Sequence, residues 1–144
     1  MNKIVRYKRK GFTLVEILVV VVILGLLAAL VIPNVIGQSD EARRTAAAVQ
    51  IKEIENALDI YRLHNGFYPT TEQGLEALVT KATTNPQPKK FVDGGYMKKV
   101  PLDPWKNPFI YRSPGEKGAI DIICTGPDGE EGTGNNITNH DPQE

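Results

Sequence analysis

The chain has 144 residues with 17 basic and 17 acidic side chains, so its formal charge is zero. A chain of this length holds one small domain with an extension, which excludes a large multidomain enzyme. The charge is unevenly distributed, because five basic residues precede Gly11: Lys3, Arg6, Lys8, Arg9 and Lys10. Without them 12 basic and 17 acidic residues remain, a formal charge of −5, which argues against a nucleic-acid-binding protein.

The first predicted element is an apolar helix of 21 residues, 12–32, with the sequence FTLVEILVVVVILGLLAALVI. Such a helix is about 30 Å long, enough to cross the hydrocarbon core of a bilayer. The basic residues before it predict a cytoplasmic N-terminus by the positive-inside rule. A secretory signal peptide is the weaker interpretation, since only Ala28-Ala29 offers a candidate cleavage site. An ordinary single-pass anchor stays open at this point.

Glu16 is the charged residue within this apolar segment. An ionised carboxylate at membrane depth is costly unless a cation pairs with it. If the chain were cut between Gly11 and Phe12, the new α-amino group would lie a little over one helical turn from Glu16. The amine of a neighbouring, axially shifted helix could then pair with this carboxylate and select one stagger between subunits. The pattern favours a polymer subunit over a passive anchor, in which Glu16 would only reach the membrane interface.

The stretch KGFTLVE, residues 10–16, resembles the cleavage and methylation signal of type IV pilins and their relatives. The resemblance implies that a prepilin peptidase removes residues 1–11 at the cytoplasmic side of the inner membrane. It also implies that the new N-terminal Phe12 is N-methylated and that Glu16 is needed for assembly. Residues 12–33 would then form a transmembrane and filament-core helix, and residues 34–144 a periplasmic globular head.

A proline separates the apolar helix from an amphipathic one. Pro33 lacks an N–H donor and is predicted to end or kink the helix near Ile32. Beyond it, Asp40 and Glu41 suit the first turn of a helix, and Asn65-Gly66 suits its end. Between them, apolar residues recur at spacings of four and three and predict one face packed on a small domain: Ala47, Ile51, Ile54, Leu58 and Tyr61.

The rest of the chain predicts a short helix and an antiparallel sheet. Thr70 followed by Gln73 forms a capping-box pattern before the run LEALV. Residues 109–112 (FIYR) and 120–125 (IDIICT) are β-prone runs joined through a Ser-Pro-Gly turn. The expected fold class is α+β: a long N-terminal helix kinked at Pro33 that continues into an amphipathic helix, packed on a small head.

Three segments of the head narrow the resemblance: YPTTEQGL at 68–75, PLDPW at 101–105 and SPG at 113–115. They are similar to the major pseudopilins of type II secretion systems, and the likeness covers nearly the whole chain. It implies a pilin-like fold and a homo-oligomeric helical filament, the periplasmic pseudopilus, that helps to export folded proteins across the outer membrane. The implied partners are minor pseudopilins, the prepilin peptidase and an inner-membrane assembly platform. Trp105 is interpreted either as a core or loop anchor or as an exposed subunit contact.

The tail at 125–141, TGPDGEEGTGNNITNHD, holds Ile137 as its only large aliphatic residue, so apolar burial is not expected to order it. Asp128 and Asn135 supply hard oxygens, and glycine-rich turns expose backbone carbonyls, a combination that suits calcium. The spacing is not that of an EF-hand, because no bidentate acid closes the loop. On residue types alone, a metal site and a disordered tail both remain open.

The pseudopilin resemblance implies that this tail binds calcium. Asp128 would be a side-chain ligand, and Thr125, Glu130 and Thr133 would offer backbone carbonyls. Asn135 stands where an acidic ligand is usual, which predicts weaker affinity. Asp121, in the preceding strand, is a less favoured contributor.

Catalysis is not indicated. Cys124 is the only cysteine, so no internal disulfide can form, and no nucleotide-binding or nucleophile motif is present. Cys124 is expected to be a buried small side chain. Two alternatives stay open: a type IVa pilin of a surface fibre, whose head commonly closes its C-terminal loop with a cysteine pair, and a membrane-anchored calcium-binding domain that forms no polymer.

Overall fold

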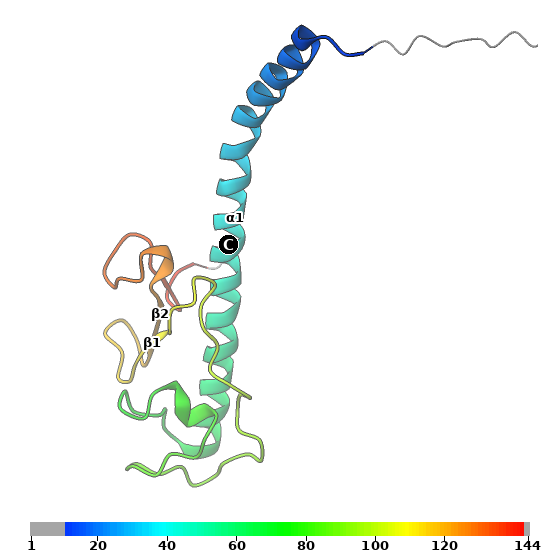
Figure 1. Cartoon of the computed structure of the whole chain (residues 1–144). Helices are drawn as coiled ribbons and strands as arrows, with labels where there is room; N and C mark the ends of the chain where they lie inside the picture. The colour runs from blue at the N-terminus through cyan, green and yellow to red at the C-terminus, as the bar shows by residue number, and fades with distance from the viewer. Residues whose placement is uncertain (1–10, 143–144) are drawn as a thin grey trace, which may run out of the picture. The chain divides into compact units, whose positions relative to one another are not determined.

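The computed structural model describes residues 11–142; residues 1–10 and 143–144 lie outside it, as do the side chains of residues 30–38. Most of the predicted leader, 1–11, therefore falls outside the described residues. The chain divides into two units, Met1–Ser39 and Asp40–Glu144. In chain order the elements are α1 (Leu14–Asn65), η1 (Leu75–Leu78), β1 (Ile110–Arg112), β2 (Asp121–Cys124), η2 (Gly126–Asp128) and β3 (Ile137–Thr138) (Figure 1).

Helix α1 is assigned over 52 residues without interruption. The chain therefore has no helix end near Ile32, and Asp40, predicted in a first turn, lies inside α1. A proline within a helix removes one backbone hydrogen bond. Each other residue that extends the helix from the turns on either side adds one, so a single proline need not end the helix. The kink predicted at Pro33 concerns residues 30–38, which lie outside the described side chains, and stays a prediction.

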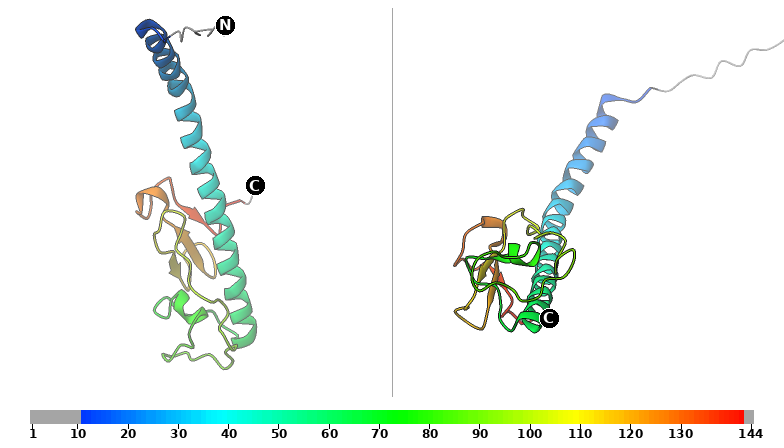
Figure 2. Two further views of the ribbon diagram at one scale, coloured as in Figure 1. Left: turned by 45° about the vertical axis from the view of Figure 1, so that its right-hand side comes forward. Right: turned by 90° about the horizontal axis from the view of Figure 1, so that it is seen from below.

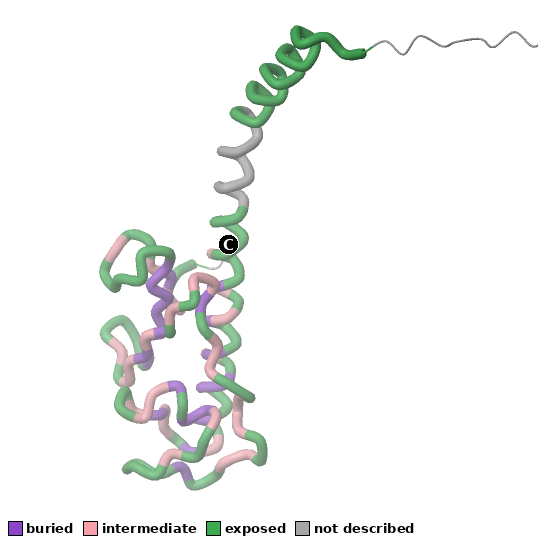
Figure 3. Tube along the Cα trace, in the orientation of Figure 1, coloured by how far each residue is buried: buried purple, intermediate pink, exposed green. Residues whose placement is uncertain are grey.

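The first unit exposes its apolar side chains. Between Phe12 and Leu27 the exposed fractions of the large apolar residues run from 49% at Val19 to 83% at Phe12 (Figure 3). Exposed apolar surface of this extent marks a contact with other molecules. Over the described part of the chain, no helix is both long and apolar enough to cross a membrane. The span predicted at 12–33 runs into residues 30–38 and stays a prediction.

In the second unit, the predicted apolar stripe of α1 is confirmed as the centre of the core. Its five members are each at most 1% exposed: Ala47, Ile51, Ile54, Leu58 and Tyr61. The helix ends at Asn65 as predicted, because Gly66 takes a φ of +86° and its N–H donates to the Arg62 carbonyl at 2.7 Å. Apolar spacing and a glycine stop signal together define this half of α1.

The capping box in the head is present, although the helix it starts is short. The Gln73 N–H donates to Thr70 Oγ1 at 3.2 Å, and the Thr70 N–H donates to Gln73 Oε1 at 3.1 Å. The box leads into a single 3-10 turn, η1, whose Leu75 and Leu78 are buried in the core. This turn brings two more leucines to the apolar face of α1.

The sheet is antiparallel with strand order β1-β2-β3. Both predicted strands are confirmed, while β3 was not predicted; its Ile137 is 8% exposed and pairs with Cys124. Tyr111, Ile122 and Cys124 belong to one apolar cluster with the α1 stripe, and the half-buried Trp105 packs against that cluster, as a core anchor would. Figure 2 shows the sheet beside α1 within this unit. The α+β fold class is confirmed.

Candidate functional site

The first candidate site is the start of α1. Glu16 Oε2 accepts hydrogen bonds from the Thr13 N–H at 2.7 Å and from Thr13 Oγ1 at 2.9 Å, and the Glu16 N–H donates to Thr13 Oγ1 at 3.3 Å. This reciprocal pattern is a capping box, and the carboxylate lies where the helix dipole favours negative charge. Gly11 and Phe12, the residues on either side of the predicted cut, are exposed. Glu16 therefore caps its own helix, a role that was not predicted above although the Thr13-x-x-Glu16 spacing is typical of a capping box.

The second candidate site is the glycine-rich loop, defined here as residues 125–136. It begins with the 3-10 turn η2 and continues through Gly129 at a φ of +71°. A β-carbon at Gly126 would stand 2.7 Å from the Asn135 carbonyl oxygen, so only glycine lets the two ends of the loop approach this closely. The loop thus folds back on itself without apolar burial.

Four of the five predicted ligand residues come together in this loop. Asn135 Nδ2 donates to Asp128 Oδ2 at 3.0 Å, and Thr133 Oγ1 donates to the Glu130 carbonyl at 3.4 Å. The hydrogen bond from Asn135 is the largest cause that lowers the pKa of the Asp128 carboxyl below its ordinary value. Thr125 lies at the base of the loop, 4% exposed, and its Oγ1 is buried without a hydrogen-bond partner among the described residues.

These donors fit calcium in their chemistry. Within residues 11–142, no group of three or more His, Cys, Asp or Glu side chains is placed to hold a metal. The predicted set instead combines the Asp128 carboxylate with an amide oxygen and backbone carbonyls, all hard oxygens. Asp128 and Asn135 already face each other across the loop. Coordination by Asn135 would require its amide oxygen, rather than its nitrogen, to face the cation.

The Asp121 side chain makes its hydrogen bonds outside the glycine-rich loop. Its side chain is 5% exposed; His140 Nε2 lies 2.6 Å from Oδ1, and the Glu116 N–H donates to Oδ2 at 2.6 Å. Burial acts to raise the pKa of the Asp121 carboxyl, but the hydrogen bonds from the Glu116 N–H, His140 and the Lys117 N–H outweigh burial and lower it. Asp121 therefore ties the C-terminal segment to the β1–β2 connection.

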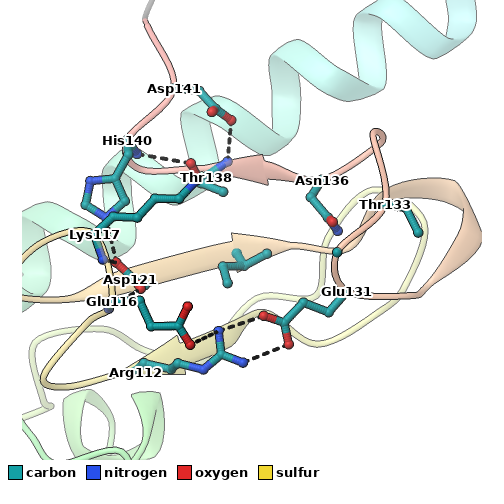
Figure 4. A pocket seen from close by; sticks show the side chains of 12 residues that line it. Arg112, Glu116, Lys117, Asp121, Glu131, Thr133, Asn136, Thr138, His140 and Asp141 are labelled. Carbon is teal, nitrogen blue, oxygen red and sulfur yellow. Dashed lines mark hydrogen bonds and ion pairs between the residues drawn. The ribbon is translucent and has the colours of Figure 1, made fainter.

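A polar pocket of about 310 Å³ lies between the Asp121–His140 pair and the glycine-rich loop, beside β1 and β2 (Figure 4). At its other side, the Arg112 guanidinium binds Glu131 through two hydrogen bonds, Nη1 to Oε1 at 2.6 Å and Nη2 to Oε2 at 2.8 Å. The bond from Arg112 lowers the pKa of the Glu131 carboxyl. Neither the Arg112–Glu131 ion pair nor the Asp121–His140 hydrogen bond was predicted from sequence, since each joins residues 19 positions apart and no local pattern marks them.

A turn at 103–107 anchors the start of the glycine-rich loop. Asp103 Oδ1 accepts the N–H groups of Trp105 at 2.9 Å and Asn107 at 2.7 Å, and Oδ2 accepts the Cys124 thiol at 3.2 Å. Asn107 Nδ2 in turn donates to the Gly126 carbonyl at 3.1 Å. Burial raises the pKa of Cys124 to about 12, so this side chain stays a thiol, as expected of a buried cysteine.

Comparisons with known proteins agree with one another. Residues 34–140 match the family model "Type II secretion system (T2SS), protein G", and residues 6–32 match "Prokaryotic N-terminal methylation motif". A type II secretion system core protein G from Vibrio cholerae is 53% identical over 95% of both chains. Its counterpart from Pseudomonas aeruginosa is 56% identical over 91% of this chain and 92% of the relative.

A solved structure extends the agreement to the fold. The crystal structure of the major pseudopilin from the type 2 secretion system of enterohaemorrhagic Escherichia coli superimposes with a TM-score of 0.68. It is 43% identical and covers 72% of this chain and 87% of its own. These matches favour a pseudopilin over a type IVa pilin or an anchored domain that forms no polymer. The chain belongs to the type II secretion system protein G family and has the pilin-like fold of a structural pseudopilus subunit, not of an enzyme.

Proposed function

We propose that this chain is inserted in the inner membrane, cut after Gly11 by a prepilin peptidase, and polymerised through residues 12–32 into a periplasmic pseudopilus. The observation that carries the proposal is the exposed apolar surface between Phe12 and Leu27, which lies within the matched methylation motif at residues 6–32. Apolar side chains at this density are unfavourable in water and suit first a bilayer and then a packed bundle of helices. Growth of the filament would help to move folded proteins across the outer membrane.

Glu16 sets the register between subunits in this proposal. Both bonds from Thr13 use Oε2, so Oε1 is the oxygen at which the methylated α-amine of a neighbouring subunit's Phe12 would bind. A charge-assisted hydrogen bond among apolar side chains is strong when both groups are otherwise satisfied. Capping of its own helix and pairing with a neighbour are thus compatible roles for one carboxylate.

Calcium is the proposed cofactor of the glycine-rich loop. The side chains of Asp128 and Asn135 and the carbonyls of Thr125, Glu130 and Thr133 would hold it. The cation would join the two ends of a loop that has few apolar side chains to bury. With one carboxylate in the set, we expect weaker binding than in a site with two, because the amide does not neutralise charge.

The proposed partners are those that filament growth in a membrane requires. They are further copies of this chain, minor pseudopilins, the prepilin peptidase and an inner-membrane assembly platform. The head has more acidic than basic residues, and the basic leader would stay in the cytoplasm until cleavage.

Glu16→Ala and Glu16→Gln test the assembly mechanism as a matched pair. Glutamine preserves the capping box but not the negative charge, whereas alanine removes both. In a strain that lacks its own major pseudopilin, both variants should be processed and remain in the membrane yet form no filaments by electron microscopy and secrete no exoprotein. Normal filaments from Glu16→Gln would refute the charge pairing and leave only the cap.

Thermal unfolding of the full chain in detergent, with calcium chloride or with EDTA, tests the metal. Calcium should raise the midpoint of the wild type, and Asp128→Ala should abolish that rise. Asn135→Asp should enlarge the rise by adding a second charged ligand. An unchanged wild-type midpoint at millimolar calcium would overturn the cofactor proposal.

A further inference from the structure

The glycine-rich loop is anchored to the head at both of its ends. At the start, Asn107 Nδ2 donates to the Gly126 carbonyl. At the end, the chain enters β3, where Ile137 pairs with Cys124 of β2. The stretch between these anchors includes Gly129 at φ +71° and Gly132 at φ +84°, backbone conformations that glycine adopts without the steric cost of a side chain.

Arg112 of β1 binds the middle of that stretch. Its guanidinium makes two parallel hydrogen bonds to the Glu131 carboxylate, and Glu116 lies at 3.9 Å from Nη1 (Figure 4). The side chains of Arg112 and Glu131 are 30% and 39% exposed, so the pair is only partly solvated. Most surface ion pairs stabilise little, but bidentate arginine–carboxylate geometry is the recognised exception.

The place of Glu131 in the loop explains how the ion pair can affect the proposed calcium site. It comes after Glu130 and before Thr133, two of the three residues whose carbonyls are proposed calcium ligands. Because both Glu131 oxygens bond to Arg112, this carboxylate is directed toward β1 and takes no part in the proposed ligand set. Binding Glu131 to a strand therefore fixes the backbone on either side of it.

We propose that Arg112 and Glu131 form a clasp that holds the glycine-rich loop closed before any cation binds. Arg112 is then a positioning residue for the proposed calcium site, although it is not a ligand. With the loop already held by this clasp, a cation would have less of the loop to order when it binds. A site binds its ligand more tightly when the binding-competent conformation of the site is already populated. The consequence for calcium rests on the proposed cofactor, whereas the closed loop does not.

Hydrogen exchange without metal tests the clasp itself. The full-length protein in detergent with EDTA is compared with Arg112→Met, Arg112→Lys and Glu131→Gln. Glu130→Gln is the matched control, since it makes the same charge change one residue away and the Glu130 side chain forms no hydrogen bond among the described residues. Exchange of the amides of residues 129–134 should accelerate about two- to fivefold in Arg112→Met and Glu131→Gln. The control should exchange like the wild type.

Arg112→Lys and one further variant, a double substitution, guard against misfolding. Arg112→Lys keeps a charge but not the fork, so its exchange should be intermediate. The exchanged pair Arg112→Glu with Glu131→Arg should restore much of the protection. Equal exchange in the wild type, Arg112→Met and Glu131→Gln, with native circular dichroism, would overturn the clasp.

A calcium titration of the same proteins separates the two proposals. If the clasp preorganises the site, the Kd for calcium should rise in Arg112→Met by the same two- to fivefold, about as much as the exchange rate. If the wild type binds no calcium while the loop amides of Arg112→Met exchange faster than those of the wild type, the cofactor proposal is refuted and the clasp is supported. A Kd unchanged by Arg112→Met, together with unchanged exchange, would refute the clasp alone.

Discussion

Replacing Asp103 tests how the turn at 103–107 supports the glycine-rich loop. Asp103→Ala removes the acceptor of the Trp105 and Asn107 N–H groups and of the Cys124 thiol. A buried donor without a partner costs about 1 to 3 kcal/mol. Since Trp105 and Asn107 are only half-buried, the lower end applies, and the two donors together should cost about 2 to 3 kcal/mol.

Asp103→Asn is the matched control for this substitution. Its amide oxygen can still accept both backbone N–H groups, because both bonds use Oδ1. Charge-assisted hydrogen bonds are roughly twice as strong as neutral ones, so we expect a loss of about 1 kcal/mol. The two variants therefore separate the loss of an acceptor from the loss of a charge.

Trp105 provides the assay, because it is the only tryptophan in the chain and packs against the core beside Asp103. Urea unfolding of the full chain in detergent, monitored by Trp105 fluorescence, should place Asp103→Ala about 1 to 2 M below the wild-type midpoint, for a slope near 1.5 kcal/mol per M. Asp103→Asn should lie between them. Equal midpoints for the two variants, or an alanine variant as stable as the wild type, would refute this account of the turn.

Three further predictions concern buried polar groups of the head. Tyr111→Phe should cost about 1 to 2 kcal/mol in the same assay, because the Tyr111 hydroxyl donates to the buried Pro69 carbonyl at 2.8 Å; an unchanged midpoint would contradict this. The lowered folded-state pKa of Asp121 gives stability that is present above its unfolded pKa, near 3.9, and is lost as pH falls through the folded pKa. The thermal midpoint of the wild type should therefore fall more steeply below about pH 4 than that of Asp121→Asn, and parallel curves would argue against the Asp121–His140 tie. Cys124, 0% exposed and with a thiol pKa of about 12, should resist iodoacetamide in the folded chain and react in urea; equal rates in both would show that it is accessible.

Local patterns predicted the parts of the fold that local physics decides. The stripe from Ala47 to Tyr61 was found because helical spacing puts those residues on one face, and all five are buried. The Thr70–Gln73 box and the Gly66 stop were found because capping depends on neighbours three or four residues away. Such signals need no knowledge of tertiary structure.

Long-range contacts could not be predicted in this way. Strand β3 has two residues, too few for an alternating pattern, and it forms because Ile137 meets Cys124 of β2. Arg112–Glu131 and Asp121–His140 each join residues 19 positions apart, so no local pattern marks these contacts. At Pro33, α1 continues without the end that the sequence allowed, while the predicted kink stays a prediction. The contacts between the residues of the loop depended on the fold.

The N-terminal end of α1 was predicted only in part from the sequence. The sequence indicated Glu16 as a carboxylate in need of a cation, and the same residue completes a capping box with Thr13 inside the apolar run. The pairing with a neighbouring amine, unlike the cap, depends on where the mature chain begins. Cleavage after Gly11 is therefore the step on which the assembly account rests.

The most direct measurement is the intact mass and N-terminal sequence of the membrane-extracted protein, expressed with and without a prepilin peptidase. The account predicts a chain that starts at N-methylated Phe12 when the peptidase is present and at Met1 when it is absent. A chain that starts at Met1 in both cases would leave Glu16 without a neighbouring amine and would contradict assembly through the processed helix.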